Sequence, residues 1–394
     1  MVEKFGYLYV RSRHINFACF TSIFYFLLAV LLCACAPDNL RVIKNPEMSN
    51  WDGKQGMYQN LHPPRFGYLE ETEYDRIDFL EPHERRPHTY RIHPDPRGDI
   101  DRTLGYDPLE FSAAPNLELI QEPVHAVQIT WLRHASFLIQ LGGEYQILVD
   151  PVIEELDGML GLLGKYAAIG TLYADSPLAT KDLPFENGAG TAAPRNTNIV
   201  AISHDLYDHL NYKTLKKLPA DTHYYIPLGL QREFPARFTN TTAMDWYTRD
   251  RLGDLTITFL PANHRSGRSM HVKNQNLWGG WLFEWKGYRI YFAGDTGYSD
   301  LFKDIRRRYG EMDVCLMPIT AWFQRHWHLA PEDAVLAAQD LGCKTFIPWG
   351  WGTWILGFEH MLEPSRRLQY AWDQMQPENM ELKMLKMGET YTLD

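Results

Sequence analysis

The chain has 394 residues and a mass of 45.9 kDa, and its 39 basic and 49 acidic residues give a formal net charge of −10. We expect no nucleic-acid partner, because neutralising phosphates requires a positively charged face. With 45% hydrophobic and 22% charged residues, the composition is that of a globular protein and excludes collagen, coiled coil and disorder of the whole chain.

Residues 1–35 have the pattern of a signal or anchor segment. Basic residues precede an apolar run from Ile15 to Ala36, as in secretory signals. The run ends in Leu32-Cys33-Ala34-Cys35, which resembles a bacterial lipoprotein cleavage box and implies lipidation of Cys35. The alternative is an uncleaved membrane helix, since about 20 apolar residues span a bilayer. In both cases we expect a membrane-tethered protein, facing the periplasm or exterior if the signal is exported.

Residues 36–123 form the second predicted region. They are rich in proline, histidine and acidic residues and show no sustained period of 2 or 3.6. An unstructured segment of this length is unusual inside a compact domain. We therefore expect a polar spacer that leaves the membrane and then wraps around the body.

Residues 124–394 carry the signals of a folded domain in which strands and helices alternate. This alternation predicts a layered α/β sandwich. The predicted strands are Val127–Leu132, Ser136–Leu141, Gln146–Val149, Asn198–Ile202, Leu255–Leu260, Leu277–Trp285, Tyr288–Phe292, Val314–Met317 and Lys344–Ile347, and the predicted helices are Leu210–Leu218, Leu301–Tyr309 and Pro331–Leu341.

The five cysteines predict no disulfide framework. Three of them lie in the N-terminal stretch, and Cys315 and Cys343 each stand alone in the sequence.

Histidines and carboxylates gather where predicted strands end. Imidazole and carboxylate are ligands that suit zinc, iron or manganese. Loops at the ends of neighbouring strands can bring such groups together although they are distant in sequence. The segments are Ser203–His209, Pro261–His264, Ala293–Gly297 and His326–Glu332.

The order of these motifs resembles the metallo-β-lactamase fold family, and within it the N-acyl-phosphatidylethanolamine-hydrolysing phospholipase D branch. The resemblance covers about 127–353. It implies an αββα sandwich of two mixed β-sheets flanked by helices, with a metal site at one edge and hydrolysis by a metal-held hydroxide. The segments that carry it are Trp131–Ser136, Leu148–Pro151, Ser203–Leu210, His264–Arg268, Leu277–Gly280 and Phe292–Tyr298.

The resemblance also implies the ligands, and two of them are missing. The family motif His-x-His-x-Asp-His falls on His204, Leu206, Asp208 and His209. The third-segment histidine is His264, the bridging aspartate is Asp295, and the final histidine of the family falls on Gly350.

Leu206 and Gly350 thus leave two incomplete metal positions. One retains His204, His264 and Asp295, and the other retains Asp208, His209 and Asp295. Three protein ligands suffice for a catalytic zinc site. We expect a divalent metal, zinc, with one ion favoured over two, and a second ion only after histidine is restored at the two substituted positions. His134 is expected to pack near the ligands or to support them from outside.

The expected activity is that of a membrane-tethered, phospholipase D-like hydrolase of a phosphodiester, either a membrane lipid or a smaller molecule. Asp208 could act as general base, and His328 could protonate the leaving oxygen. Two alternatives remain: a hydrolase of lactones or other esters, since fold does not determine substrate, and a pseudoenzyme lipoprotein that lost its metals.

Overall fold

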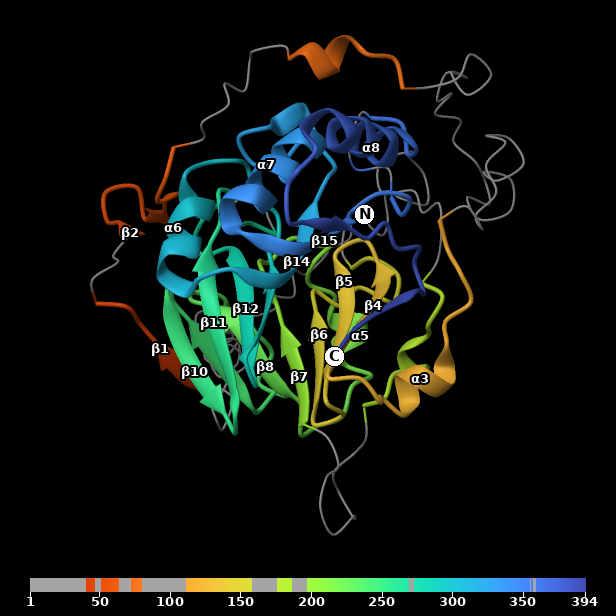
Figure 1. The fold of residues 1–394 in the computed structure, drawn as a ribbon. Coiled ribbons are helices and arrows are strands. Elements are labelled where there is room, and N and C mark those ends of the chain that lie inside the picture. The colour runs from red at the N-terminus through yellow and green to blue at the C-terminus, as the bar shows by residue number, and fades with distance from the viewer. Residues whose placement is uncertain are drawn as a thin grey trace, which may run out of the picture.

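Two β-sheets pack face to face in the protein, and helices cover the outside of this pair (Figure 1). The predicted αββα sandwich is confirmed. The signal segment 1–35 with Cys35 lies outside the described residues. Among the helices of the described segments, none has both the length and the apolar character needed to cross a membrane. The structure, a computed structural model, describes residues 40–46, 51–63, 72–79, 111–157, 176–185, 197–268, 273–354, 356 and 359–394.

The first sheet has eight strands in the order β1-β9-β8-β7-β6-β5-β4-β17. The pairs from β17 to β6 are antiparallel and the pairs from β6 to β1 are parallel. The strands are β1 (Arg41–Ile43), β4 (Val127–Arg133), β5 (Ser136–Leu141), β6 (Tyr145–Val149), β7 (Thr197–Ala201), β8 (His223–Pro227), β9 (Thr241–Met244) and β17 (Thr390–Leu393).

The second sheet has seven strands in sequence order from β10 to β16. Its pairs are antiparallel up to β13 and parallel from β13 onward. The strands are β10 (Thr248–Leu252), β11 (Leu255–Pro261), β12 (Gly279–Trp285), β13 (Tyr288–Phe292), β14 (Met312–Pro318), β15 (Cys343–Trp349) and β16 (Glu381–Leu382).

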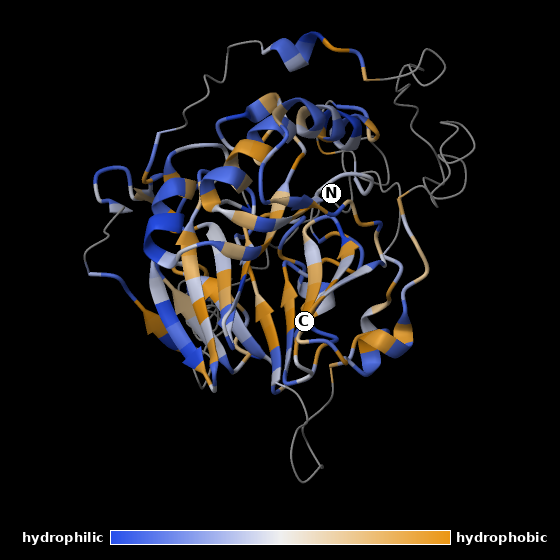
Figure 2. Cartoon of the chain, in the orientation of Figure 1, coloured by the Kyte–Doolittle hydropathy of each residue, from blue (hydrophilic) through white to orange (hydrophobic). Residues whose placement is uncertain are grey.

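Alternation along the central strands places side chains on both faces of the first sheet. In β5, Phe137, Ile139 and Leu141 join the core between the sheets, whereas Leu138 joins a second apolar cluster on the outer face. This period of two follows from the pleat of a strand. Because both faces are covered, all six residues of β5 are buried, and Figure 2 shows hydrophobic residues on the strands of this sheet with polar residues between them.

Helices α6 (Leu301–Tyr309), α7 (Pro331–Leu341) and α8 (Glu363–Met375) lie next to one another, with α7 against β14 and β15 (Figure 1). Gly342 ends α7 in the left-handed conformation that favours glycine. The short helices α3 (Leu117–Gln121) and α5 (Tyr212–Leu215) contribute to the cluster on the other side. Helix α5 is shorter than the predicted Leu210–Leu218. The Asn211 side chain caps its start by accepting a hydrogen bond from the Thr214 amide, and Pro219 disfavours helical geometry at Leu218.

Parts of the predicted spacer 36–123 contact the body. Strand β1 extends the edge of the first sheet by pairing in parallel with β9. The hairpin of β2 (Trp51–Asp52) and β3 (Met57–Tyr58) follows it. Further on, Asp75 forms an ion pair of 2.9 Å with the buried Arg367 of α8. These contacts link the segment to the first sheet and to helix α8.

The structure corrects the expectation for two cysteines. Cys315 of β14 and Cys343 of β15, which stand alone in the sequence, form a disulfide across these neighbouring parallel strands. Both cysteines are buried. They are 28 residues apart in the sequence, and the pairing of β14 with β15 brings them close together.

Candidate metal centre

The loops that follow four strands carry the polar residues of the site. Asp150 directly follows β6, and the loop after the neighbouring β7 carries His204, Asp208 and His209. The loop after β11 carries His264, and the loop after β13 carries Asp295. The rigid strands therefore determine where these side chains start.

A glycine allows two of these loops to approach closely. Gly294 has a φ of +60°, and a Cβ placed on it would lie 2.6 Å from the carbonyl oxygen of Gly279 and 2.9 Å from Cβ of Ser203. The amide of Gly279 also donates a hydrogen bond of 3.0 Å to the carbonyl of Ser203. A side chain at position 294 would force Asp295 away from His204.

Four imidazoles surround one carboxylate oxygen. Oδ2 of Asp295 lies 3.3 Å from Nε2 of His209, 3.7 Å from Nε2 of His264 and 3.8 Å from Nε2 of His204. Nδ1 of His328 is 3.9 Å from the same oxygen. Residues from four separate segments, all singled out in the sequence, therefore meet at this point.

The opposite ring nitrogens set the orientation of the imidazoles. When a histidine binds metal, its second nitrogen usually donates a hydrogen bond to a carboxylate, a carbonyl or water. In this structure Nδ1 of His209 pairs with the Asp150 carboxylate at 2.7 Å, Nδ1 of His204 with the Ser203 hydroxyl at 2.8 Å, and Nδ1 of His264 with the Trp327 carbonyl at 3.1 Å.

The inward nitrogens fit a metal ion. Nε2 of His204, of His209 and of His264 is buried and has no hydrogen-bond partner among the described residues. Buried polar atoms are almost always paired, so three unpaired acceptors around one carboxylate require another explanation. Imidazole nitrogens and a carboxylate oxygen are a common ligand set for zinc.

Burial and neighbouring charges hold His204, His264 and Asp295 in the forms that bind metal. Burial lowers the pKa of His264 to about 3 and that of His204 well below its ordinary value, so both rings are neutral. Burial alone would raise the pKa of Asp295, but the imidazoles of His209, His328 and His264 hold it well below its usual range. A neutral imidazole and an ionised carboxylate are the forms that coordinate a metal. His209 differs: burial lowers its pKa, but the carboxylates of Asp295, Asp208 and Asp150 outweigh burial and raise its pKa well above the ordinary value, so this ring releases a proton when it binds an ion.

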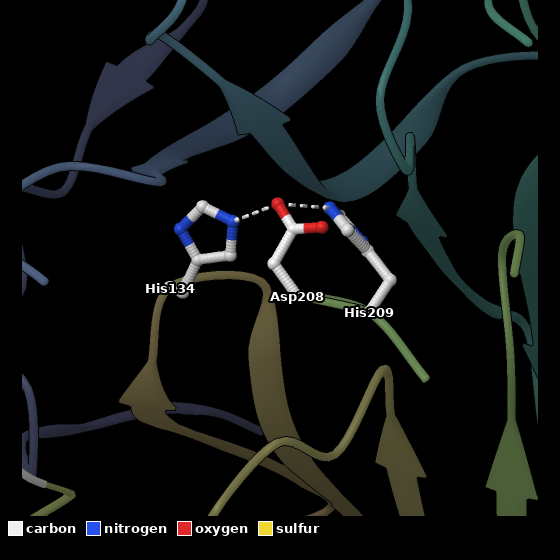
Figure 3. Close-up of side chains that lie close together, drawn as sticks. All are labelled: His134, Asp208 and His209. Carbon is white, nitrogen blue, oxygen red and sulfur yellow. Dashed lines mark ion pairs between the residues drawn. The ribbon is translucent and has the colours of Figure 1, made fainter. Parts of the chain in front are cut away.

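A second group of potential ligands lies beside the first. Oδ2 of Asp208 is 3.3 Å from Nε2 of His134 and 3.7 Å from Nε2 of His209 (Figure 3). His134, which we expected to pack near the ligands or to support them from outside, has its Nε2 in a group of atoms that could hold an ion, together with atoms of Asp208 and His209. The reason is that the turn between β4 and β5 reaches the loop after β7.

The two substituted positions face the same cleft. Leu206 and Gly350 line it, and neither offers a ligand atom. The cleft has an internal volume of about 210 Å³. Its polar lining includes His134, Asp208, Arg265, Asp295 and His328, and its apolar lining includes Phe323, Trp351, Trp354, Leu356 and Met361.

Two residues of the site had no role in the sequence interpretation. Asp150 is completely buried and holds His209 through a hydrogen bond. Its signal in the sequence is its place in the segment Leu148–Pro151, directly after a buried strand. Arg265 enters the cleft with its guanidinium 4.3 Å from the ring centroid of Trp327. Its signal is its position directly after His264.

His328 reaches the cleft on a loop that ion pairs hold in place. Arg325, three residues earlier, is buried and pairs with Glu332 and with Asp333 at the start of α7. His328 itself is 15% exposed, which leaves it accessible from the cleft. His326 and His360 belong to none of the groups of potential metal ligands in the described part of the chain.

Comparisons with known proteins agree with this geometry. A family described as "Beta-lactamase superfamily domain" matches residues 145–351. The N-acyl-phosphatidylethanolamine-hydrolyzing phospholipase D 1 of Caenorhabditis elegans is 27% identical over 85% of this chain and 87% of its own length. An uncharacterized protein of Mycobacterium tuberculosis is 30% identical over 66% of this chain and 67% of its own length.

A solved structure shows the same fold. The possible metal-dependent hydrolase from Veillonella parvula superposes with a TM-score of 0.51 and 16% identity, over 68% of this chain and 100% of that chain.

Proposed function

Because the chain belongs to the metallo-β-lactamase superfamily and is a metal-dependent hydrolase, we propose that its substrate is a phosphodiester of a membrane lipid. The preferred candidate is an N-acyl-phosphatidylethanolamine, the lipid named for the nematode relative. The proposed products are phosphatidic acid and the released head group.

One observation carries the choice of a phosphodiester. Arg265 extends into the cleft that contains Asp295 and His328, and its Nε is buried without a hydrogen-bond partner among the described residues. A guanidinium forms strong, paired hydrogen bonds with phosphate oxygens. A neutral lactone would offer no negative charge to compensate for the burial of this cation.

The apolar side of the cleft supports a lipid substrate. Phe323 is 38% exposed beside the ligand residues, and Trp354, Leu356 and Met361 line the same cleft. Aromatic and aliphatic side chains that line a cleft next to a polar centre suit a molecule with a charged head group and hydrocarbon chains.

The residues of the cleft have separate tasks in the proposed hydrolysis. A divalent metal, which we propose to be zinc, would supply Lewis-acid chemistry when bound by His204, His264 and Asp295. Arg265 binds a non-bridging phosphate oxygen. Water adds to phosphorus as the P–O bond to the head group breaks. The proton that the water loses is taken up by Asp208 and passes through His328 to the leaving oxygen.

The substrate is tested with full-length protein in detergent. Mixed micelles of N-acyl-phosphatidylethanolamine should release phosphatidic acid after the protein is reloaded with zinc, and chelation should stop the release. Turnover of neutral esters or lactones without turnover of any phosphodiester would contradict the proposal and favour the ester-hydrolase alternative.

Replacing Arg265 should change substrate selectivity. We expect Arg265→Gln to lower kcat/KM for bis(4-nitrophenyl) phosphate about 10- to 100-fold, since a hydrogen bond to a charged group contributes about 1.5–3 kcal/mol. The loss should appear mainly in KM, and the neutral substrate 4-nitrophenyl acetate should change less than about threefold.

Arg265→Lys is the matched control for this test. It keeps the charge but loses the planar fork, so it should fall between the wild type and the glutamine variant. An equal loss on both substrates would mean that Arg265 serves the structure of the cleft and not the recognition of phosphate.

We further propose that the protein is a bacterial lipoprotein, tethered to the membrane through Cys35 and facing the periplasm or exterior. The disulfide between Cys315 and Cys343 supports an exported protein, because structural disulfides persist mainly in oxidising compartments. A membrane tether would also place the cleft near lipid substrates.

Cys35→Ser should release the protein from membranes. After fractionation, we expect the wild type in the membrane pellet and the variant in the soluble fraction or in an uncleaved precursor band. Cys33→Ser is the control and should remain lipidated. Membrane retention of the mature-sized Cys35→Ser protein would instead indicate a membrane-spanning anchor.

A further inference from the structure

We infer that His134 is a direct ligand of a second metal ion, which it binds together with Asp208 and His209. The inference rests on the metal dependence of the centre and does not depend on the proposed phosphodiester substrate. It revises the expectation of a single ion, which rested on the absence of a histidine at position 350.

The separations of the ligand atoms suit one ion. Metal–ligand bonds of about 2.0–2.2 Å in a tetrahedral zinc site place neighbouring ligand atoms about 3.3–3.6 Å apart. Oδ2 of Asp208 lies 3.3 Å from Nε2 of His134 and 3.7 Å from Nε2 of His209. Figure 3 shows the carboxylate between the two rings, with both ring nitrogens directed toward it.

The surroundings of His134 hold its ring in a ligand orientation. Its Nδ1 is 3.3 Å from the carbonyl oxygen of Gly350, and its backbone amide donates a hydrogen bond of 3.1 Å to the Thr353 hydroxyl. The ring also packs edge-on against Trp354. A hydrogen bond from Nδ1 to a backbone carbonyl leaves the Nε2 lone pair free, as in known metal-binding histidines.

Position 350 cannot supply the ligand itself. Gly350 has a φ of +104°, and a Cβ added to it would lie 2.6 Å from Oγ1 of Thr320. This conformation is strained for any residue other than glycine. Gly350 instead presents its backbone carbonyl oxygen to Nδ1 of His134. The residue that replaces the family's histidine therefore helps to orient the imidazole that we propose as its substitute.

The second ion would not compete with the first for protein ligands. One group consists of His204, His264 and Asp295, and the other of His134, Asp208 and His209, so the two share no residue. Asp295 lies 3.3 Å from Nε2 of His209 and is therefore placed between the two positions. Each position has the three protein ligands that a catalytic zinc ion commonly has.

The deciding experiment counts ions. Full-length protein is stripped with chelator, reloaded with zinc or cobalt, freed of excess metal and analysed by mass spectrometry of the metal. We expect about two ions per chain in the wild type and about one in His134→Gln. Cobalt absorption should show the loss of one of two sets of bands. His223→Gln, at the start of β8 and outside both ligand groups, is the control and should retain two ions.

Two further variants separate a ligand from a residue that only orients Asp208. In His134→Gly, added imidazole should restore the second ion, because a free imidazole can occupy the vacated space and coordinate the metal. Gly350→His should not raise the ion count in a His134→Gln background and should lower the melting temperature. Restoration of the second ion by Gly350→His would contradict the assignment of His134.

The outcomes distinguish this inference from the proposed function. Two ions in His134→Gln, or one ion in a hydrolytically active wild type, would overturn the role of His134 and leave the phosphodiesterase proposal intact. Two ions in the wild type and one in His134→Gln, without hydrolysis of any phosphodiester, would support the role of His134 and contradict the substrate proposal.

Discussion

Asp295→Asn should remove metal from the centre and lower hydrolysis by at least about 100-fold. The reason is its position: one carboxylate oxygen lies within 3.9 Å of ring nitrogens from four histidines. Loss of an outer hydrogen-bond partner of a ligand already costs about 10–100-fold in affinity or activity, and loss of a direct ligand should cost at least as much. Metal content and kcat/KM are the two measurements.

Asp300→Asn is the matched control for Asp295→Asn. It makes the same chemical change five residues along the chain. The Asp300 side chain is 52% exposed, and its Oδ1 lies 4.0 Å from Nζ of Lys303, which makes a weak ion pair. It should keep full metal content and activity, since exposed ion pairs contribute little. Asp295→Asn protein that is folded and retains the metal content of the wild type would contradict the central role of this carboxylate.

Asp150→Asn should weaken metal binding about 10- to 100-fold, although Asp150 is not itself a proposed ligand and acts through His209. Its carboxylate accepts hydrogen bonds from the amide and the hydroxyl of Ser203 and pairs with Nδ1 of His209. An asparagine has one acceptor oxygen and one NH2 group, so no orientation satisfies all three partners. The melting temperature should also fall, because an unsatisfied buried polar group costs about 1–3 kcal/mol.

The test for Asp150 measures zinc affinity with a competing chelator and then activity at saturating zinc. Recovery of kcat at high zinc would identify Asp150 as a positioning residue that acts through His209. Asp205→Asn is the control: its carboxylate bonds to Gly267 and Asn276 instead of an imidazole, so it should affect stability more than zinc affinity. Equal zinc affinity of Asp150→Asn and the wild type would contradict the prediction.

Elements with a strong local pattern were predictable from the sequence. The predicted Ser136–Leu141, Tyr288–Phe292, Leu301–Tyr309 and Pro331–Leu341 match β5, β13, α6 and α7 residue for residue. Each has an apolar run or a helical period with a turn or a proline at its boundary.

Elements that depend on distant partners were not predictable in this way. Strand β1 has three residues and exists because Arg41, Val42 and Ile43 pair with β9, about 200 residues away. The pairing of Cys315 with Cys343 belongs to the same class, since the register of β14 and β15 creates it. The sequence patterns also do not predict β8, β9, β10 and α8, although β10 pairs with the adjacent β11 and α8 is a local element.

The candidate site shows the same division. The motifs marked His204, Asp208, His209, His264 and Asp295, and the structure brings all five together. The roles of His134, Asp150 and Arg265 depend on which ring nitrogen faces inward, which carboxylate holds it and which cation enters the cleft. These features depend on how the side chains are oriented, which cannot be predicted from the spacing of residues in the sequence.

The sequence by itself determined the family, the layered α/β class and the residue types gathered at the strand ends, because strand periodicity and motif order are local properties of the chain. Only the tertiary structure decided that a turn between β4 and β5 brings His134 to Asp208 while Gly350 contributes a carbonyl oxygen. The physical reason is that a ligand set is defined by distances of 3–4 Å between atoms, and residues 134, 208 and 350 reach such distances only when both sheets are packed.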